Sequence, residues 1–421
     1  MPKFIIQGNK PLSGQIAVAG AKNEALKIIP SALLSEEPLL ISNLPDIEDT
    51  KRALEIIEDL GGSVNHHNEK TITISISNIS KNILEAKFAN KIRASIMFIA
   101  PLLARQGEAI FPHPGGCVLG ADQRPIDLFL EGYKKLGAEI SIKDGLYHLK
   151  AKRLKGCRYF FTKISVTGTE SLLMAATLAE GTTVLENCAM EPEIVSLAKS
   201  LNQRGAIIKG AGTPTIVIEG VKKINGGEVK IMPDRIETGT FAILSAATRS
   251  PLEITNCEPN HIAALLAIFE KIGIDWEANK DSLTIKKIPK DFPSYSIKTH
   301  EYPGFPSDLQ SPYTVLMTQA NGSAMIHETI YDRRLLFTDM LSQMGAKVTM
   351  CDPHRVLIQG PTKLHGRALT SPDLRAGISM IIAGLIAEGK TEIDNIYQIE
   401  RGYEKIDERL RAIGAEITKI E

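Results

Sequence analysis

The sequence has few aromatic residues, no excess of charge of either sign and no long uninterrupted apolar run. Aromatic side chains make up 5% of its 421 residues and include one Trp, which disfavours a stacking surface for bases. Lys and Arg together number 49, as do Asp and Glu, so the formal net charge is zero. Proteins that mainly bind nucleic acid usually carry a strong basic excess, so no nucleic-acid partner is expected. An anionic small molecule in a local basic pocket remains compatible with this balance.

Membrane and exported classes are disfavoured as well. The longest apolar stretches, near 92–104 and 377–387, are too short to cross a bilayer. Residues 1–8 lack the apolar segment of a signal peptide. No two cysteines have the close spacing of a zinc or redox motif; the five are Cys117, Cys157, Cys188, Cys257 and Cys351. We therefore expect a cytoplasmic protein with free thiols, no membrane association and no bound metal.

Length and internal repetition predict two domains, because a single core rarely grows beyond about 250–300 residues. One phrase recurs along the chain: a turn, an alternating strand, a helical pattern and a glycine. Its clearest copies begin with Leu178–Asn187 and Ile386–Asn395. The glycine returns about every 70 residues, at Gly61, Gly137, Gly205, Gly273, Gly345 and Gly414. We expect each of these glycines to end a helix in the left-handed conformation.

Each repeat also predicts a helix that is apolar on all sides and therefore buried. The clearest such helices are Ser171–Ala179, Gly239–Ala247 and Ala376–Ala387. The predicted fold is α/β, with two domains of three repeated sheet-plus-helix units around buried helices. The predicted N-terminal domain is 22–231, and the C-terminal domain is 1–21 plus 232–421, with the active site in the cleft between them.

Two segments with cations or a thiol are candidate sites. Lys22 stands where an alternating strand gives way to a helix start, a place that binds anions through free backbone N–H groups. An ordinary helix start with a solvated lysine fits the pattern equally well. Cys117 lies in a loop rich in Pro and Gly, 112–127, and an approaching Arg124 or Lys22 would lower its thiol pKa. An ordinary loop thiol is an equally good interpretation.

Asp308 is the third candidate, after the irregular segment Tyr302–Pro306 and at the start of a predicted helix toward Gln319. It is either a helix cap or a general base. Isolated arginines are usually solvated or ion-paired, but several at comparable element starts suggest an anion site. Those arginines are Arg93, Arg334, Arg375 and Arg401.

Taken together and in order, these segments resemble the UDP-N-acetylglucosamine 1-carboxyvinyltransferase family of enolpyruvyl transferases. The resemblance runs from near residue 3 to near residue 417. It rests on Gly20–Asn23, the Pro114–Cys117 loop that ends in Arg124–Asp127, Pro233–Gly239, Pro303–Asp308, Asp373–Ala376 and Arg401–Glu404. It implies two domains of the inside-out α/β barrel type with three repeats each, in agreement with the repeat pattern.

The resemblance implies that the enolpyruvyl group of phosphoenolpyruvate is transferred to the 3′-hydroxyl of UDP-N-acetylglucosamine, with release of phosphate. This is the first committed step of peptidoglycan synthesis, and hence of cell-wall biogenesis. The implied partners are these two small molecules, with no cofactor. Cys117 would also be the target of fosfomycin. The oligomeric state stays open, with a monomer as the expectation.

The same resemblance implies roles for individual residues. Asp308 would accept the hydroxyl proton, and Cys117 would protonate the methylene carbon and could bond to the enolpyruvyl unit; Lys22 and Arg401 complete the catalytic set. The implied phosphoenolpyruvate-binding residues are Lys22, Asn23, Arg124, Arg334, Arg375 and Arg401. The implied nucleotide-sugar residues are Asn23, Arg93, Arg124, Pro125, Ile126, Asp127, Leu128, Lys163, Ile164, Ser165, Val166, Asp308 and Ile330.

Two features depart from the family pattern. The loop after Cys117 is two residues longer, through Ala121–Gln123, and Phe129 stands where a His is common. Alternative functions are an enolpyruvyl transferase for shikimate 3-phosphate, an inactive repeat protein that binds a nucleotide sugar, and an RNA-end-modifying enzyme. The Pro-Gly-Gly-Cys loop disfavours the first of these. The joint presence of the catalytic set disfavours the second, and the neutral charge disfavours the third.

Overall fold

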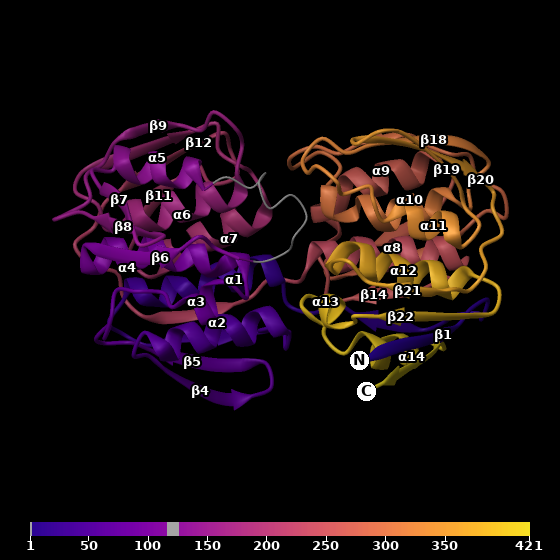
Figure 1. The fold of residues 1–421 in the computed structure, drawn as a ribbon, viewed down its shortest axis with the longest axis horizontal. Helices are drawn as coiled ribbons and strands as arrows, with labels where there is room; N and C mark the ends of the chain where they lie inside the picture. The colour runs from indigo at the N-terminus through magenta and orange to yellow at the C-terminus, as the bar shows by residue number, and fades with distance from the viewer. Residues whose placement is uncertain (1, 116–125) are drawn as a thin grey trace. The chain divides into compact units, whose positions relative to one another are not determined.

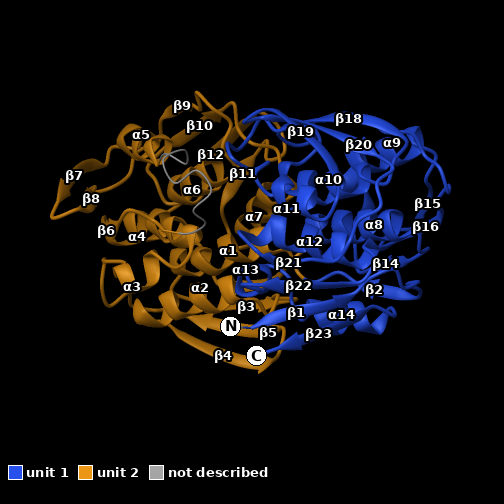
Figure 2. Ribbon diagram, turned by 45° about the vertical axis from the view of Figure 1, so that its right-hand side comes forward, with its two compact units in different colours: residues 1–19, 233–421 blue, residues 20–232 orange. Residues whose placement is uncertain are grey.

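The computed structural model describes residues 2–115 and 126–421. The chain divides into two compact units, which Figure 2 colours separately. Unit 1 comprises 1–19 and 233–421, and unit 2 comprises 20–232. The chain therefore passes between the units twice, after Ala19 and after Met232. The boundaries expected from the sequence differ from these by two residues at the first crossing and by one at the second.

The described part of unit 2 forms three sheets. Two have four strands each, with one parallel pair followed by two antiparallel pairings. The first has the order β13 (Gly227–Lys230), β3 (Leu39–Ser42), β5 (Thr71–Ser75), β4 (Ser63–Asn68). The second has the order β9 (Arg158–Phe160), β10 (Thr182–Glu186), β12 (Thr215–Glu219), β11 (Ile207–Lys209). The third is β6 (Glu108–Pro112), β8 (Leu146–Lys150), β7 (Glu139–Lys143), with an isolated parallel bridge from Ile83 to Ile110 beside β6.

The described part of unit 1 repeats this strand pattern in three four-stranded sheets. Their orders are β2 (Gln15–Ala17), β14 (Glu253–Thr255), β16 (Ser282–Lys287), β15 (Asp275–Ala278); β17 (Ile297–Lys298), β18 (Gly322–His327), β20 (Arg355–Gly360), β19 (Lys347–Asp352); and β21 (Ala368–Thr370), β22 (Lys390–Asp394), β1 (Lys3–Gln7), β23 (Glu416–Ile420). The N-terminal strand β1 thus pairs with the C-terminal strand β23.

Helices that are largely buried lie between the sheets of each unit (Figure 1). In unit 2 they are α1 (Lys22–Ser31), α4 (Ile99–Gln106) and α6 (Val166–Thr177); in unit 1 they are α8 (Arg235–Thr248), α10 (Gln310–Met317) and α12 (Leu374–Ile386). The other helices are α2 (Glu48–Asp59), α3 (Ala86–Ala89), α5 (Asp127–Lys135), α7 (Pro192–Gln203), α9 (Ala263–Lys271), α11 (Thr338–Gln343), α13 (Tyr397–Glu400) and α14 (Ile406–Ala412). These elements confirm the predicted α/β fold with repeated sheet-plus-helix units.

The six repeat glycines all adopt the predicted left-handed conformation. Their φ angles lie between 79° and 103°, and each glycine follows the end of a helix. A side chain is costly in this conformation, so glycine favours the turn from helix to strand. The buried helix expected at Ser171 begins earlier, at Val166, because Ser165 caps it: its Oγ accepts a hydrogen bond from the Gly168 N–H at 3.1 Å.

Each unit has its own hydrophobic core, formed by the buried helices and the inner faces of its sheets. On β10 the alternation works as predicted, with Thr183 and Leu185 buried and their neighbours partly exposed. Among the described helices, none combines the length and the apolar character that a membrane crossing requires.

Candidate active site

Asp308 of unit 1 lies between two arginine side chains. It belongs to the short 3₁₀ helix Ser307–Leu309, which leads into α10. Its Oδ1 accepts a hydrogen bond from Nη2 of Arg334 at 2.7 Å, and its Oδ2 accepts one from Nη2 of Arg375 at 2.9 Å. In this described part of the chain, neither helix start has a side-chain cap. The cap interpretation of Asp308 is therefore wrong, and its carboxylate bridges two cations.

Burial and charge act in opposite directions on this group. The side chains of Arg334 and Arg375 are 7% and 10% exposed, whereas that of Asp308 is 27% exposed. Burial alone would raise the pKa of Asp308, but the charges of Arg375 and Arg334 and their hydrogen bonds hold it well below its usual range. Burial also opposes the charged guanidinium, yet the charge of Asp308 raises the pKa of both arginines. Two cations thus share one anion.

The start of α12 places Arg375 independently of Asp308. Asp373 caps this helix: its Oδ1 accepts hydrogen bonds from the backbone N–H of Arg375 at 2.8 Å and of Ala376 at 3.1 Å. Tyr403 and Asp234 also interact electrostatically with the guanidinium. The helix cap therefore holds the backbone of Arg375 at one end of α12.

Glu328, which the sequence analysis did not single out, fixes the segment that carries Arg334. This fully buried carboxylate accepts hydrogen bonds from the backbone N–H of Ile330 at 2.9 Å and of Tyr331 at 3.1 Å. Its other oxygen accepts one from Ser307 Oγ at 2.8 Å. The guanidinium carbon of Arg334 lies 5.0 Å from the centre of the Tyr331 ring. Glu328 directly follows β18 (Gly322–His327), and a charged residue at the end of an alternating strand was the available sequence signal.

Arg401 belongs to unit 1 but to another segment. It follows the end of α13, where its Nη1 donates a hydrogen bond to Oε1 of Gln398 at 3.2 Å. The described hydrogen bonds therefore bring Asp308 together with Arg334 and Arg375. They connect Arg401 to α13 instead.

Lys22 opens α1 in unit 2 and faces a carboxylate. Its Nζ lies 2.8 Å from Oδ2 of Asp49 on α2, and the two side chains are 12% and 5% exposed. In the described chain the N-cap residue of this helix, Ala21, makes no side-chain cap hydrogen bond. Glu24 anchors the same turn, since its Oε2 accepts a hydrogen bond from the Met232 N–H at 2.6 Å. Asn23 lies between them and is partly exposed.

The residues expected to bind the nucleotide sugar fall mainly on helix starts of unit 2. Arg93 begins the 3₁₀ helix Arg93–Phe98, and its Nη1 donates a hydrogen bond to the Pro114 carbonyl at 3.1 Å. The α6 start carries four of the set, Lys163, Ile164, Ser165 and Val166. The α5 start carries Ile126, Asp127 and Leu128.

Tyr159 connects the α5 start with β9, because its hydroxyl donates a hydrogen bond to the Leu128 carbonyl at 3.1 Å. Phe129, the next residue of α5, is 5% exposed and packs in the core of unit 2. Its position therefore offers apolar packing rather than a polar contact. Ile330, the remaining nucleotide-sugar candidate, belongs to unit 1 and is held by Glu328.

Three of the predicted site residues lie outside the described residues: Cys117, Arg124 and Pro125. The roles expected for them stay predictions, as does the effect of the longer loop.

A second buried charge pair, absent from the sequence expectations, lies in the core of unit 2. Lys27 Nζ of α1 is 3.3 Å from Oε2 of Glu170 on α6, and the side chains are 7% and 0% exposed. Among the described residues, neither Glu170 oxygen has a well-formed hydrogen bond. Burial raises the pKa of Glu170 to about 8; Lys27 opposes this rise, and the charges of Glu193 and Glu191 add to it. Glu170 is therefore largely protonated at neutral pH.

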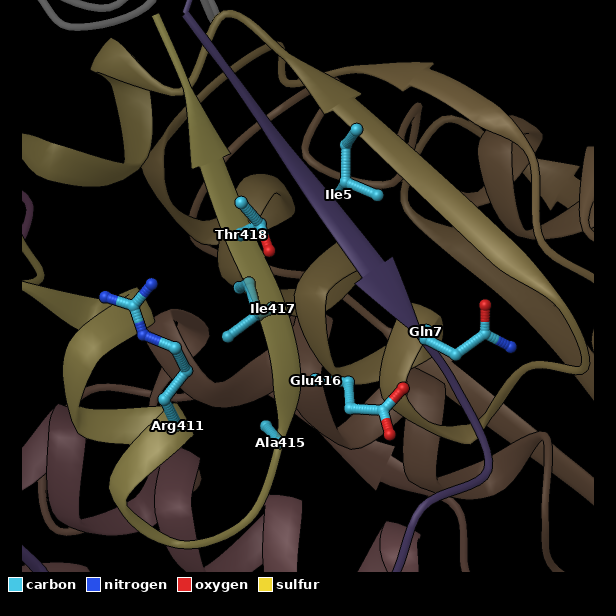
Figure 3. Close-up of a pocket in the computed structure, with 7 residues that line it drawn as sticks. All are labelled: Ile5, Gln7, Arg411, Ala415, Glu416, Ile417 and Thr418. Atoms are coloured by element: carbon cyan, nitrogen blue, oxygen red, sulfur yellow. The ribbon is translucent and has the colours of Figure 1, made fainter.

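A hollow on unit 1 lies over β1 and β23 (Figure 3). Its lining consists of Ile5, Gln7, Arg411, Ala415, Glu416, Ile417 and Thr418. This set contains no predicted site residue from the described chain, so the hollow is not the candidate site. Across 2–115 and 126–421, no three His, Cys, Asp or Glu side chains gather as a metal ion would require.

Comparison with known proteins relates the whole chain to one family. The family model described as EPSP synthase (3-phosphoshikimate 1-carboxyvinyltransferase) matches residues 6–410. A UDP-N-acetylglucosamine 1-carboxyvinyltransferase of Koribacter versatilis is 44% identical over 426 residues, which cover 100% of this chain and 97% of the relative. A protein of the same name from Treponema denticola is 44% identical and covers 99% of both chains.

Solved structures with lower sequence identity share the fold. The enolpyruvyl transferase NikO from Streptomyces tendae has a TM-score of 0.90 at 24% identity and covers 99% of this chain and 98% of its own. EPSP synthase from Acinetobacter baumannii has a TM-score of 0.75 at 18% identity and covers 100% of both chains. At these identities the likeness concerns the fold alone.

Proposed function

Because the chain belongs to the EPSP synthase (3-phosphoshikimate 1-carboxyvinyltransferase) family, and within it to the UDP-N-acetylglucosamine 1-carboxyvinyltransferases, we propose that it transfers the enolpyruvyl group of phosphoenolpyruvate to the 3′-hydroxyl of UDP-N-acetylglucosamine. Phosphate is the second product, and the reaction starts peptidoglycan synthesis. The observation that carries the proposal is 44% identity to both relatives, over 97% and 99% of their lengths.

In this reaction Asp308 takes the hydroxyl proton while the sugar oxygen bonds to C2 of phosphoenolpyruvate. Cys117 delivers a proton to C3. The bond between C2 and the phosphate oxygen then breaks, and its electron pair leaves with phosphate. Loss of a proton from C3 restores the double bond in the product; this proton regenerates the Cys117 thiol, and the proton held by Asp308 leaves with the phosphate. Every atom comes from the two substrates, so the reaction needs no cofactor.

Cations stabilise the negative charge of the donor and of the departing phosphate. We assign this role to Lys22, Arg124 and Arg401, with Asn23 beside the sugar. Arg334 and Arg375 supply two further forks for an anionic group of the donor, which their position around the Asp308 carboxylate supports. Because Lys22 belongs to unit 2 and Asp308 to unit 1, the proposal requires both units to contribute to one reaction.

We assign the nucleotide sugar to the helix starts of unit 2, through Arg93, the Ile126–Leu128 turn and the Lys163–Val166 turn, together with Ile330 of unit 1. Backbone N–H groups at helix starts suit the diphosphate of such a ligand. We place the reaction in the cytoplasm, with which the free thiols among the described cysteines are consistent. Cys117 would be the residue that fosfomycin modifies.

Phosphate release with each candidate acceptor tests the function. The purified protein is incubated with phosphoenolpyruvate and either UDP-N-acetylglucosamine or shikimate 3-phosphate, and the organic product is identified by mass. We expect phosphate release only with the nucleotide sugar, whose mass increases by one enolpyruvyl group. Turnover of shikimate 3-phosphate alone would assign the chain to the other branch of the family. Release with neither acceptor would contradict both assignments.

A further inference from the structure

The fork between Arg334 and Arg375 is already occupied by a carboxylate of the protein itself. Each oxygen of Asp308 accepts one hydrogen bond from a different guanidinium. This is the arrangement that a substrate carboxylate or phosphate would adopt between two arginines. While the Asp308 carboxylate occupies the site that an anionic group of the enolpyruvyl donor would bind, it cannot also act as the base for the acceptor hydroxyl.

Resting on the proposed function, we propose that Asp308 acts as an internal substitute for an anionic group of the enolpyruvyl donor, which displaces it from the fork on binding. Exchange of the two anions would release the Asp308 carboxylate toward the acceptor hydroxyl. Donor binding would thereby switch on the base that the acceptor needs. The donor group involved is its carboxylate or its phosphate, both of which fit two guanidinium forks.

The geometry allows this exchange without rebuilding the fork. The Asp308 side chain is 27% exposed and hence within reach of a ligand, while the two arginine side chains beneath it are almost fully buried. Asp373 holds the backbone of Arg375 through the α12 cap, and Tyr331 lies against Arg334. After Asp308 leaves, the helix cap still holds the backbone of Arg375, and the Tyr331 ring still lies beside the Arg334 guanidinium.

Several carboxylates surround the two arginines of the fork, and they differ in whether a ligand can replace them. Arg334 interacts electrostatically with Asp308, Glu328, Tyr331 and Asp373, and Arg375 does so with Asp308, Tyr403 and Asp234. Both oxygens of Glu328 accept protein hydrogen bonds, and an oxygen of Asp373 does so at the α12 start. Of these carboxylates, Asp308 is partly exposed and accepts a hydrogen bond from each arginine, so it is the one that a ligand can replace.

The exchange also removes a chemical difficulty. Two guanidiniums hold the pKa of Asp308 well below its usual range, and such a carboxylate is a weak base. Once a donor anion has taken both hydrogen bonds, Asp308 loses its partners and gains a negative neighbour. Its pKa then rises toward the range in which a carboxylate can accept a proton in the transition state.

Direct binding of phosphoenolpyruvate to variants tests this inference. All proteins carry Cys117→Ser to prevent covalent attachment, and calorimetry is done with and without UDP-N-acetylglucosamine. When an internal group occupies a site, the apparent affinity falls by the fraction of molecules in which the site is free. We therefore expect Asp308→Ala to bind the donor about tenfold more tightly or better. Unchanged or weaker binding would overturn the exchange.

Asp373→Asn is the matched control. It removes a negative charge near Arg334 but keeps the helix cap, because Asn is also a good capping residue. We expect its donor affinity to change by less than about threefold. An equal gain in this variant would assign the effect to net charge and overturn the exchange.

Two further measurements complete the design. Asp308→Asn, whose amide offers one acceptor oxygen instead of two, should bind more tightly than the parent if Asp308→Ala fails to fold; an unchanged affinity would again overturn the exchange. Competition by pyruvate, which has only the carboxylate, and by inorganic phosphate identifies the displacing group. If either probe competes with phosphoenolpyruvate more strongly in Asp308→Ala than in the parent protein, the exchange is supported. If neither probe does so, the exchange is contradicted. Failure of the parent protein to bind phosphoenolpyruvate at all would instead contradict the proposed function.

Discussion

The carboxylates of Asp308 in unit 1 and Glu170 in unit 2 both lie beside cationic side chains, but their pKa values shift in opposite directions. In unit 1, Asp308 accepts hydrogen bonds from Arg334 and Arg375, and its pKa lies well below the usual range despite burial. In unit 2, the cation paired with Glu170 among the described residues is Lys27, at 3.3 Å and without a well-formed hydrogen bond, and burial raises the pKa of Glu170 to about 8. Burial opposes the charged carboxylate at both sites. Two cations with hydrogen bonds outweigh it at the partly exposed Asp308, whereas one cation at 3.3 Å does not at the fully buried Glu170.

Removal of the unit 1 carboxylate should have the largest effect on activity. Asp308→Ala leaves no base for the acceptor hydroxyl, so we expect turnover to fall at least about 100-fold. Steady-state phosphate release at saturating substrates measures it. Asp339→Ala on α11 is the control, because that carboxylate is exposed and should leave turnover unchanged. A loss of tenfold or less would remove Asp308 from the role of base.

Glu170→Gln should change the pH dependence of stability, because Gln resembles the protonated acid. The folded pKa of about 8 lies above the ordinary 4.5, so between these values the folded protein holds a proton that the unfolded chain has lost. This contribution favours folding at low pH and disappears as pH rises through 8. As pH rises, we expect the free energy of unfolding of wild type to fall relative to that of the variant by at most about 1.4 kcal/mol per pH unit.

Urea unfolding followed by circular dichroism at pH 5, 6, 7 and 8 measures this difference. The exposed Glu180→Gln serves as the control and should parallel wild type. Parallel curves for Glu170→Gln and wild type would show that Glu170 is ionised throughout, as Asp308 is.

Arg375→Met tests the opposite case in unit 1. The change leaves Asp308 with one cation, so we expect a loss of about 2 kcal/mol, less than for a fully buried pair because Asp308 is partly exposed. Fluorescence of Trp276, the single Trp and a residue of unit 1, follows urea unfolding. Arg355→Met, at a pair with Asp352 whose side chains are 54% and 30% exposed, should leave the free energy of unfolding almost unchanged. Equal losses in the two variants would contradict the special role of the fork.

The repeated architecture could be predicted because it depends on local rules. Each repeat glycine ends a helix with positive φ, and the apolar helices are buried as their patterns indicate. The sequence also singled out Asp308, Arg334 and Arg375 as separate candidates. It could not reveal that they contact one another, since 26 and 67 residues separate Asp308 from its partners and the fold alone brings them together.

Buried charges escaped prediction for a different reason. Glu170 stands immediately before the apolar helix expected from Ser171, and a helical pattern is judged by its apolar positions. Its partner Lys27 lies on another helix, so no spacing rule connects them. Glu328 was missed because its function is to accept hydrogen bonds from a loop, which only the structure shows.

Lys27→Met should have the smallest effect on stability, and it gives the sharpest test of the comparison between Asp308 and Glu170. Since Glu170 is largely protonated at neutral pH, Lys27 has no full ion pair to lose, and an apolar side chain of similar length suits its site. We expect stability at pH 7 to change by less than about 1 kcal/mol, or to increase. A loss of about 2 kcal/mol, as for Arg375→Met, would mean that the pair is ionised. The double variant Lys27→Met with Glu170→Gln tests the coupling of the two side chains. If the stability changes of the single variants nearly add, the coupling is weak; if they are strongly non-additive, unit 2 holds a true ion pair.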